Sequence, residues 1–150
     1  MSNVSLLETA MLKEVATADF YREVAERIGN AAGKSKFMEL SREEENHLEA
    51  LKRWYAKETG GKKFNQDTAC QPLDYSFPQQ AVFDGASALE AISVGISAEK
   101  ESIDLYTSFR QEVADEEAVK TLERLIEFEK GHLRRLQQEY DAVLNHFYWL

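Results

Sequence analysis

Two copies of a Glu-x-x-His motif, Glu44-Glu45-Asn46-His47 and Glu129-Lys130-Gly131-His132, lie 85 residues apart in this chain of 150 residues. An isolated glutamate precedes each motif by 30 residues, Glu14 before the first and Glu99 before the second. The chain therefore carries four carboxylates and two imidazoles in two equivalent sets. This is the ligand inventory of a carboxylate-bridged dinuclear metal site inside a four-helix bundle.

The composition is that of one globular domain covering residues 1–150, with 43% hydrophobic and 30% charged residues. The net charge of −9 argues against a nucleic-acid partner, which would require a basic face. We see no apolar stretch long enough to cross a membrane and no secretory signal, so we expect a cytoplasmic protein without membrane contact. The single cysteine, Cys70, excludes intrachain disulfides and a cysteine-ligated cluster within one chain.

Helix-breaking residues divide the chain into two helical hairpins and a linker. Both prolines, Pro72 and Pro78, fall in a segment without sustained periodicity at about 59–84. We expect hairpin 1 at about 4–57 and hairpin 2 at about 86–147, each antiparallel because its turn is short. The expected helices cover about 4–28, 34–57, 86–113 and 116–144. A linker of this length can cross the whole bundle, so the sequence predicts an all-α four-helix bundle with a crossover connection.

The two hairpins match each other at the offset of 85 residues without gaps. The identities include every expected ligand as well as one aspartate and two tyrosines in each half. They are Glu14/Glu99, Asp19/Asp104, Tyr21/Tyr106, Leu40/Leu125, Glu44/Glu129, His47/His132, Leu48/Leu133, Leu51/Leu136 and Tyr55/Tyr140. We interpret the chain as a duplicated hairpin, so its site should have approximate two-fold symmetry.

Six ionisable residues interrupt the otherwise apolar seams of the four expected helices. They are Glu14, Glu44, His47, Glu99, Glu129 and His132. Because a buried unpaired carboxylate costs several kcal/mol, four at one level require cations. Carboxylate-rich sites favour iron or manganese, with zinc also possible. In this pattern Glu44 and Glu129 would bridge two ions, and Glu14 and Glu99 would be the terminal carboxylates. A single Glu-x-x-His would more often be a solvated surface pattern, but here two occur in register.

Several neighbouring residues have more than one interpretation. Tyr21 and Tyr106 lie on the ligand face, either as core aromatics or as donors that orient a metal-bound carboxylate. Asp19 and Asp104 would either accept a hydrogen bond from the histidine rings or lie on the surface. Outside the site, we expect Glu43 and Glu45 on a solvated face and an inert Cys70. His146 has no counterpart in the repeat and is left out of the site. The apolar tail that follows it could cap the bundle or bury itself in a partner subunit.

The patterns Glu14-x6-Tyr21, Glu99-x6-Tyr106 and the two Glu-x-x-His-Leu segments resemble the rubrerythrin branch of the ferritin-like superfamily. The resemblance covers all four expected helices and implies a ferritin-like bundle with a non-haem di-iron centre. It further implies that the four glutamates are catalytic and that hydrogen peroxide is reduced to water, the diferrous centre giving two electrons. Some members of the family are instead linked to iron oxidation or to reduction of O2.

Two departures from the family pattern modify this expectation. Many rubrerythrins carry a C-terminal rubredoxin domain, whereas this sequence ends at Leu150, so we expect a separate electron donor such as a rubredoxin-like protein. Full rubrerythrins also use an extra glutamate on the third helix, where position 102 is a serine here. Glu101 could replace that glutamate only if the helix contains a π-bulge.

Three functions follow as hypotheses from this sequence. The first is reduction of hydrogen peroxide at two iron ions. The second is a ferroxidase or oxygen-reducing iron-handling protein, and the third a non-enzymatic, metal-dependent structural or sensor module. Because a hairpin repeat with a long linker can exchange halves between chains, we expect a homodimer, which a domain swap could form.

Overall fold

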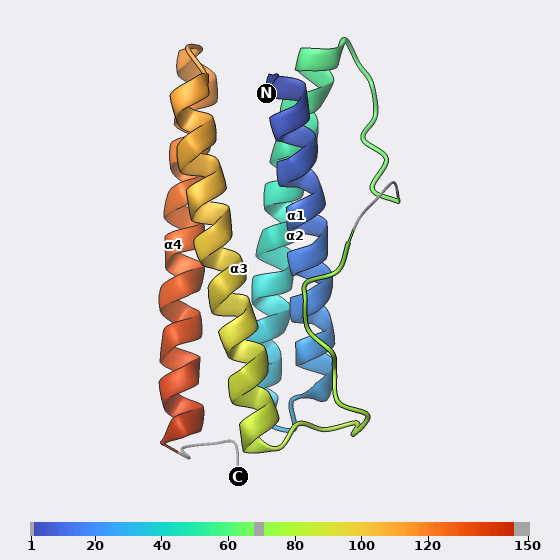
Figure 1. Ribbon diagram of the computed structural model, residues 1–150, viewed down its shortest axis with the longest axis vertical. Coiled ribbons are helices and arrows are strands. Elements are labelled where there is room, and N and C mark those ends of the chain that lie inside the picture. The colour runs from blue at the N-terminus through green and yellow to red at the C-terminus, as the bar shows by residue number, and fades with distance from the viewer. Residues whose placement is uncertain (1, 68–70, 146–150) are drawn as a thin grey trace.

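Four long helices form the computed structural model of the chain, which describes residues 2–67 and 71–145. The helices are α1 (Asn3–Arg27), α2 (Ala31–Thr59), α3 (Gly85–Glu112) and α4 (Glu116–Leu144), and no strand occurs among the described residues (Figure 1). The predicted all-α class is confirmed. Cys70, His146 and the apolar tail lie outside the described residues.

Side chains that cap the helices determine where each one begins. Asn30 accepts hydrogen bonds from the backbone N–H groups of Ala32 and Gly33, so α2 begins at Ala31, earlier than the expected Lys34. Asp84 and Asp115 cap α3 and α4 in the same way. The helix α2 ends at Thr59 and is capped by Gly60, whose φ of 71° is a left-handed conformation that glycine adopts without strain.

The helices are arranged as two antiparallel hairpins joined by a crossover. The helices α1 and α2 pack along each other, as do α3 and α4, while α1 also contacts α3 and α2 contacts α4. The linker starts at the end of α2 and runs the length of the bundle to the opposite end, where α3 begins (Figure 1). The predicted four-helix bundle with a long crossover is confirmed, and α2 and α3 consequently run in the same direction.

The second half of the linker is fastened to the end of α1. The Arg27 guanidinium donates to the carbonyl oxygen of Pro78 at 2.6 Å and lies 4.8 Å above the centre of the Phe77 ring. The backbone N–H of Phe83 donates to the carbonyl oxygen of Arg27 at 2.8 Å. Phe20 adds an edge contact with Tyr75, so aromatic packing covers this face of α1.

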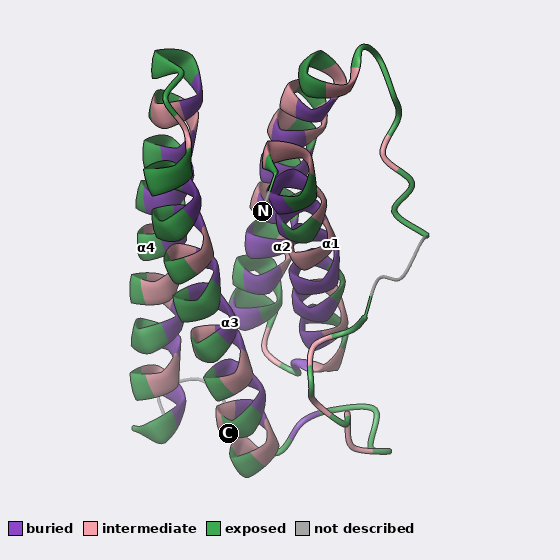
Figure 2. Cartoon of the chain, turned by 45° about the horizontal axis from the view of Figure 1, so that its top comes forward, coloured by how far each residue is buried: buried purple, intermediate pink, exposed green. Residues whose placement is uncertain are grey.

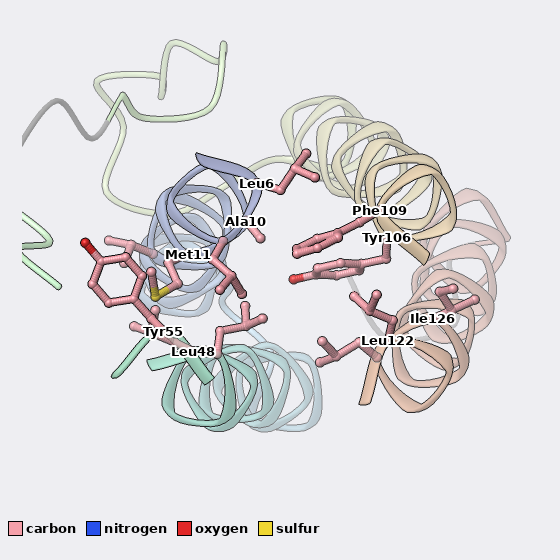
Figure 3. Packing of buried hydrophobic residues seen from close by; sticks show 13 residues of the cluster. Leu6, Ala10, Met11, Leu48, Tyr55, Tyr106, Phe109, Leu122 and Ile126 are labelled. Carbon is pink, nitrogen blue, oxygen red and sulfur yellow. The ribbon is translucent and has the colours of Figure 1, made fainter. Parts of the chain in front are cut away.

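Two hydrophobic clusters fill the interior, and Figure 2 shows the buried faces of the helices turned toward one another. One cluster includes Leu7 and Met11 from α1, and Figure 3 shows the rings of Tyr106 and Phe109 pointing into it from α3. The other cluster includes Phe37 of α2. Members of these clusters flank the expected metal ligands in sequence on each helix, so apolar packing surrounds that level of the bundle. Within the described residues, no helix is both long and apolar enough to cross a membrane.

Candidate metal centre

The six residues expected as metal ligands are all buried, although each carries an ionisable group. Their exposed fractions lie between 0% and 6%, for Glu14, Glu44, His47, Glu99, Glu129 and His132. All four helices contribute, because α1 and α3 supply one glutamate each while α2 and α4 supply a glutamate and a histidine each. The three-residue spacing in each Glu-x-x-His motif places both side chains on one face of its helix.

The structure brings these side chains into two groups that overlap. In the first group, Glu14, Glu44, His47 and Glu129 offer donor atoms that all lie within 4.8 Å of one another. The second group of the same kind consists of Glu44, Glu99, Glu129 and His132. Because Glu44 and Glu129 belong to both groups, the geometry matches two adjacent cation sites with two shared carboxylates. Each site then has one further glutamate and one histidine of its own.

Each histidine faces the shared glutamate of the other hairpin. The Nδ1 atom of His132 lies 2.6 Å from Glu44 Oε1, and that of His47 lies 2.9 Å from Glu129 Oε1. Both rings therefore present the same nitrogen to the carboxylates. The two rings stack with their centres 5.4 Å apart and their planes at 17°. This arrangement follows the two-fold symmetry that the duplicated sequence predicts.

Two buried tyrosines fix the carboxylates that are not shared. The Tyr21 hydroxyl of α1 donates to Glu99 Oε1 of α3 at 2.6 Å, and the Tyr106 hydroxyl of α3 donates to Glu14 Oε1 of α1. Each hydrogen bond crosses between the hairpins. Gly95 leaves room for the Tyr21 ring, since a Cβ there would lie 3.1 Å from Tyr21 Cε1. Both hydroxyls thus bond to expected ligand carboxylates, as one of the two sequence interpretations requires.

Several polar atoms of this cluster are buried without a hydrogen bond in the described part of the chain. They are Glu14 Oε2, His47 Nδ1, Glu99 Oε2, both carboxylate oxygens of Glu129, and His132 Nε2. His47 Nδ1 and Glu129 Oε1 lie 2.9 Å apart but lack the geometry of a hydrogen bond. Unpaired buried polar atoms are rare in folded proteins and costly. The tyrosine-bonded glutamates each keep one such oxygen. A pair of cations fits this donor set, since it would occupy carboxylate and imidazole atoms that otherwise lack partners.

The electrostatics of the cluster also indicate that positive charge belongs there. Burial, followed by repulsion from neighbouring glutamates, raises the pKa of Glu44 and of Glu129 well above the usual range. Burial alone would lower the pKa of His47, but its contacts with carboxylates outweigh burial and raise it. For Glu99, burial opposes ionisation, yet contacts with Glu129 and His132 lower the pKa. In the absence of metal, protons therefore supply the missing positive charge.

Three expectations about neighbouring residues are settled by their positions. Asp19 and Asp104 are exposed, and Asp19 accepts from Arg22 at 3.0 Å, so the interpretation that they bind the histidine rings is wrong. Glu101 also lies outside the site, where it pairs with Lys13 at 2.8 Å. The helix α3 is α-helical throughout, without the π-bulge that would turn Glu101 inward.

One contact near the site was missed by reasoning from the sequence. Glu43 was expected on a solvated face, but it is half-buried and pairs with Arg135 of α4 at 2.8 Å. Its Oε1 atom lies 3.8 Å from His132 Nε2. The available signal was a break in the duplication, because the counterpart of Glu43 at the offset of 85 is Phe128.

Solved structures with the same fold are found over nearly the whole chain. A hypothetical protein from Pyrococcus furiosus has 26% sequence identity and a TM-score of 0.84, with 97% of this chain and 92% of that chain covered. A ferritin-like diiron-carboxylate protein from Thermotoga maritima has 28% identity and a TM-score of 0.71, with coverages of 94% and 95%. A dodecameric thioferritin from Bacteroides fragilis, at 17% identity, has a TM-score of 0.77 and coverages of 95% and 86%. The search of curated proteins finds no match.

The crossover bundle and its buried glutamate–histidine cluster define a ferritin-like protein of the diiron-carboxylate class. The sequence model of one family within that class, rubrerythrin, matches residues 5–140. The chain therefore belongs to the rubrerythrin family, as its sequence patterns predict.

Proposed function

We propose that this protein is a non-haem di-iron oxidoreductase that reduces hydrogen peroxide to water with electrons from a separate donor. The observation that carries the proposal is the pair of overlapping ligand groups that share Glu44 and Glu129. Membership of the rubrerythrin family supports iron as the metal. Iron ions bound at these residues would supply the two electrons that reduction of one peroxide molecule consumes.

In this proposal each residue of the cluster has a distinct role. Glu44 and Glu129 would hold both ions, while Glu14 and His47 would complete one half-site. Glu99 and His132 complete the other half-site. Manganese or zinc would be bound by the same donors, so the identity of the metal is part of the proposal. Because metal replaces protons on Glu44 and Glu129, loading should release protons to the solvent.

The tyrosines would orient the terminal carboxylates rather than bind metal. Burial, together with neighbouring carboxylates, raises the pKa of Tyr21 and of Tyr106 well above the usual value, so both hydroxyls keep their protons. Each hydroxyl then holds one carboxylate oxygen and leaves the second oxygen, Glu99 Oε2 or Glu14 Oε2, for a cation. Reduction of one peroxide molecule to two water molecules also consumes two protons, which would come from the solvent because all four carboxylates would hold the ions.

The proposed partners are the oxidant, an electron donor and a second copy of the chain. A rubredoxin-like protein is the donor that the family resemblance suggests. We also propose a cytoplasmic homodimer, in which a swap of hairpins is one possible arrangement. Size measurement by light scattering would test the dimer, because one chain has a mass of 17.2 kDa.

Metal loading followed by single-turnover kinetics tests the proposal. The reduced, iron-loaded protein is mixed anaerobically with hydrogen peroxide, and oxidation is followed by absorbance. Glu129→Ala and Glu99→Ala should each abolish both iron loading and turnover, whereas Glu101→Ala, at an exposed position, should change neither. Normal turnover by a Glu129→Ala protein that binds no iron would refute the proposal.

A ferroxidase or oxygen-reducing function is the second candidate, favoured by the outward position of Glu101. The site then lacks the additional carboxylate that the resemblance associates with peroxide reduction. Oxidation by O2 as fast as by peroxide, in the same stopped-flow experiment, would favour this candidate. Metal that raises the melting temperature but never changes oxidation state would instead indicate a structural or sensor module.

A further inference from the structure

The duplicated sequence predicts two equivalent half-sites, but the surroundings of the two histidines differ. At the offset of 85 residues, Glu43 of α2 corresponds to Phe128 of α4, and Arg135 of α4 corresponds to Ala50 of α2. The approximate two-fold symmetry therefore relates the ion pair Glu43–Arg135 to the pair Phe128–Ala50. An ion pair with two long side chains has been replaced by one aromatic ring and a methyl group.

On the His132 side, the ion pair closes the space between α2 and α4. The Arg135 guanidinium donates to Glu43 Oε2 at 2.8 Å, and Glu43 Oε1 lies 3.8 Å from His132 Nε2. Both partners are only partly exposed. His132 itself is 1% exposed, so side chains from both helices cover its outer edge.

On the His47 side, the same space contains a cavity, and His47 is 6% exposed. Ala50 is too short to reach across to α4, and Phe128 lies against His47 with the ring centres 5.3 Å apart. Phe128 is 53% exposed, so its ring is not fixed by packing on all sides. A cavity of about 640 Å³ between α2 and α4 is lined by His47, Ala50, Trp54, Leu125 and Phe128 among others. His132 does not line it, although Glu43, the partner of Arg135, does.

The lining of this cavity combines charged and apolar side chains. Arg53, Lys57 and Arg124 contribute positive charge, while several acidic residues, including Glu117 opposite Lys57 at 3.7 Å, balance it. Leu125 and Phe128 contribute apolar wall, and the Phe128 ring lies against His47. Because charges of both signs line the cavity, it would admit neutral molecules as well as ions. Of the two ligand histidines, only His47 lines it.

We propose that this α2–α4 cavity is the entry path and binding pocket for a small neutral or anionic molecule of peroxide size. The molecule reaches the half-site of Glu14 and His47 rather than that of Glu99 and His132. The inference rests on the proposed function, because it assumes that the cluster holds metal. It adds that the two half-sites are unequal, with Phe128 and Ala50 determining access.

Azide binding to the oxidised, iron-loaded protein tests the path without measuring turnover. Sodium azide gives a charge-transfer absorbance when it binds ferric iron, so its association rate can be followed by stopped flow. The double variant Ala50→Arg/Phe128→Glu copies the ion pair of the His132 side and leaves the net charge unchanged. We expect azide association to slow by about an order of magnitude, because the new side chains fill the cavity.

Arg135→Ala provides the control for the other side, since Arg135 closes the space beside His132 but does not line the α2–α4 cavity. It should speed azide association, and Phe128→Ala should do the same through the His47 side. Iron content and helicity are measured for each variant, and Phe128→Ala decides the matter if the double variant fails to fold. A protein that binds iron but takes up azide at one rate in all variants overturns the entry path. A wild-type protein that binds no iron overturns the proposed function instead.

Discussion

Removal of one hydroxyl group, in Tyr21→Phe, should weaken both the fold and the affinity for metal. The Tyr21 hydroxyl donates to Glu99 Oε1 at 2.6 Å, and both residues are 0% exposed. Without this donor, Glu99 Oε1 would lose its tyrosine partner in a layer that already contains unpaired oxygens. The ring itself would keep its contact with Phe37, so the change isolates the hydrogen bond.

The magnitude follows from the burial and charge of the acceptor. A hydrogen bond to a charged group contributes about 1.5–3 kcal/mol to stability, and both partners of this one are fully buried. For a chain of this length, about 2 kcal/mol corresponds to a fall in Tm of roughly 4–8 °C. Loss of a group that orients a metal-bound side chain typically lowers metal affinity by about 10-fold to 100-fold.

Thermal unfolding of the metal-free protein and titration with Fe(II) under anaerobic conditions measure the two effects. Tyr106→Phe, which removes the symmetric donor to Glu14, should behave alike. Tyr55→Phe is the matched control, because its hydroxyl lies 3.5 Å from Glu8 and contributes little. If Tyr21→Phe melts with the wild type and binds Fe(II) equally well, the role assigned to the tyrosine is wrong.

Three further predictions concern charge and the linker. The metal-free protein should lose thermal stability from pH 5 to pH 8, because the raised pKa values of Glu44, Glu129 and His47 stabilise the fold only while these groups hold protons. A Tm that rises over this range in the presence of a chelator would contradict this. Glu129→Gln should stabilise the metal-free protein at pH 8 by roughly 1–3 kcal/mol while preventing metal loading, as calorimetry and metal analysis would report. Arg27→Ala should cost about 1–2 kcal/mol in urea unfolding, since it removes the bond to the Pro78 carbonyl and the contact with Phe77.

The fold could be predicted well because the heptad spacing within each helix agreed with the duplication that relates the two hairpins. Heptad spacing placed Glu14 and Tyr21 on the buried face of the first helix, and both are buried. Duplication at a fixed offset then required the second hairpin to repeat the first. The start of α2 was less predictable, because the choice between a longer turn and a cap at Asn30 depends on local hydrogen bonds.

The candidate site was predictable as a set of residues but not in its contacts. The sequence indicated that Tyr21 and Tyr106 share a face with the ligands, but not that each bonds to the glutamate of the opposite hairpin. Such pairings depend on how α1 and α3 approach each other, which helical periodicity does not determine. The position of Asp19 was left open for the same reason. Asp19 is only one position away from the buried face of its helix. This difference is enough to place its side chain on the surface, in an ion pair with Arg22, rather than against a ligand histidine.

Charge balance explains why the buried cluster of four glutamates and two histidines would favour cations. It also explains why the oxidised site would attract anions through the α2–α4 cavity. Four carboxylates with protonated imidazoles still carry excess negative charge, which the raised pKa values of Glu44 and Glu129 reduce by retaining protons. Two divalent cations with neutral imidazoles would balance the four carboxylates without any proton. Oxidation of each ion by one electron would leave two positive charges in excess, and a buried layer favours neutralisation. A monovalent anion that enters beside His47 would offset one of these two charges, whereas the Glu43–Arg135 ion pair obstructs the corresponding path to His132.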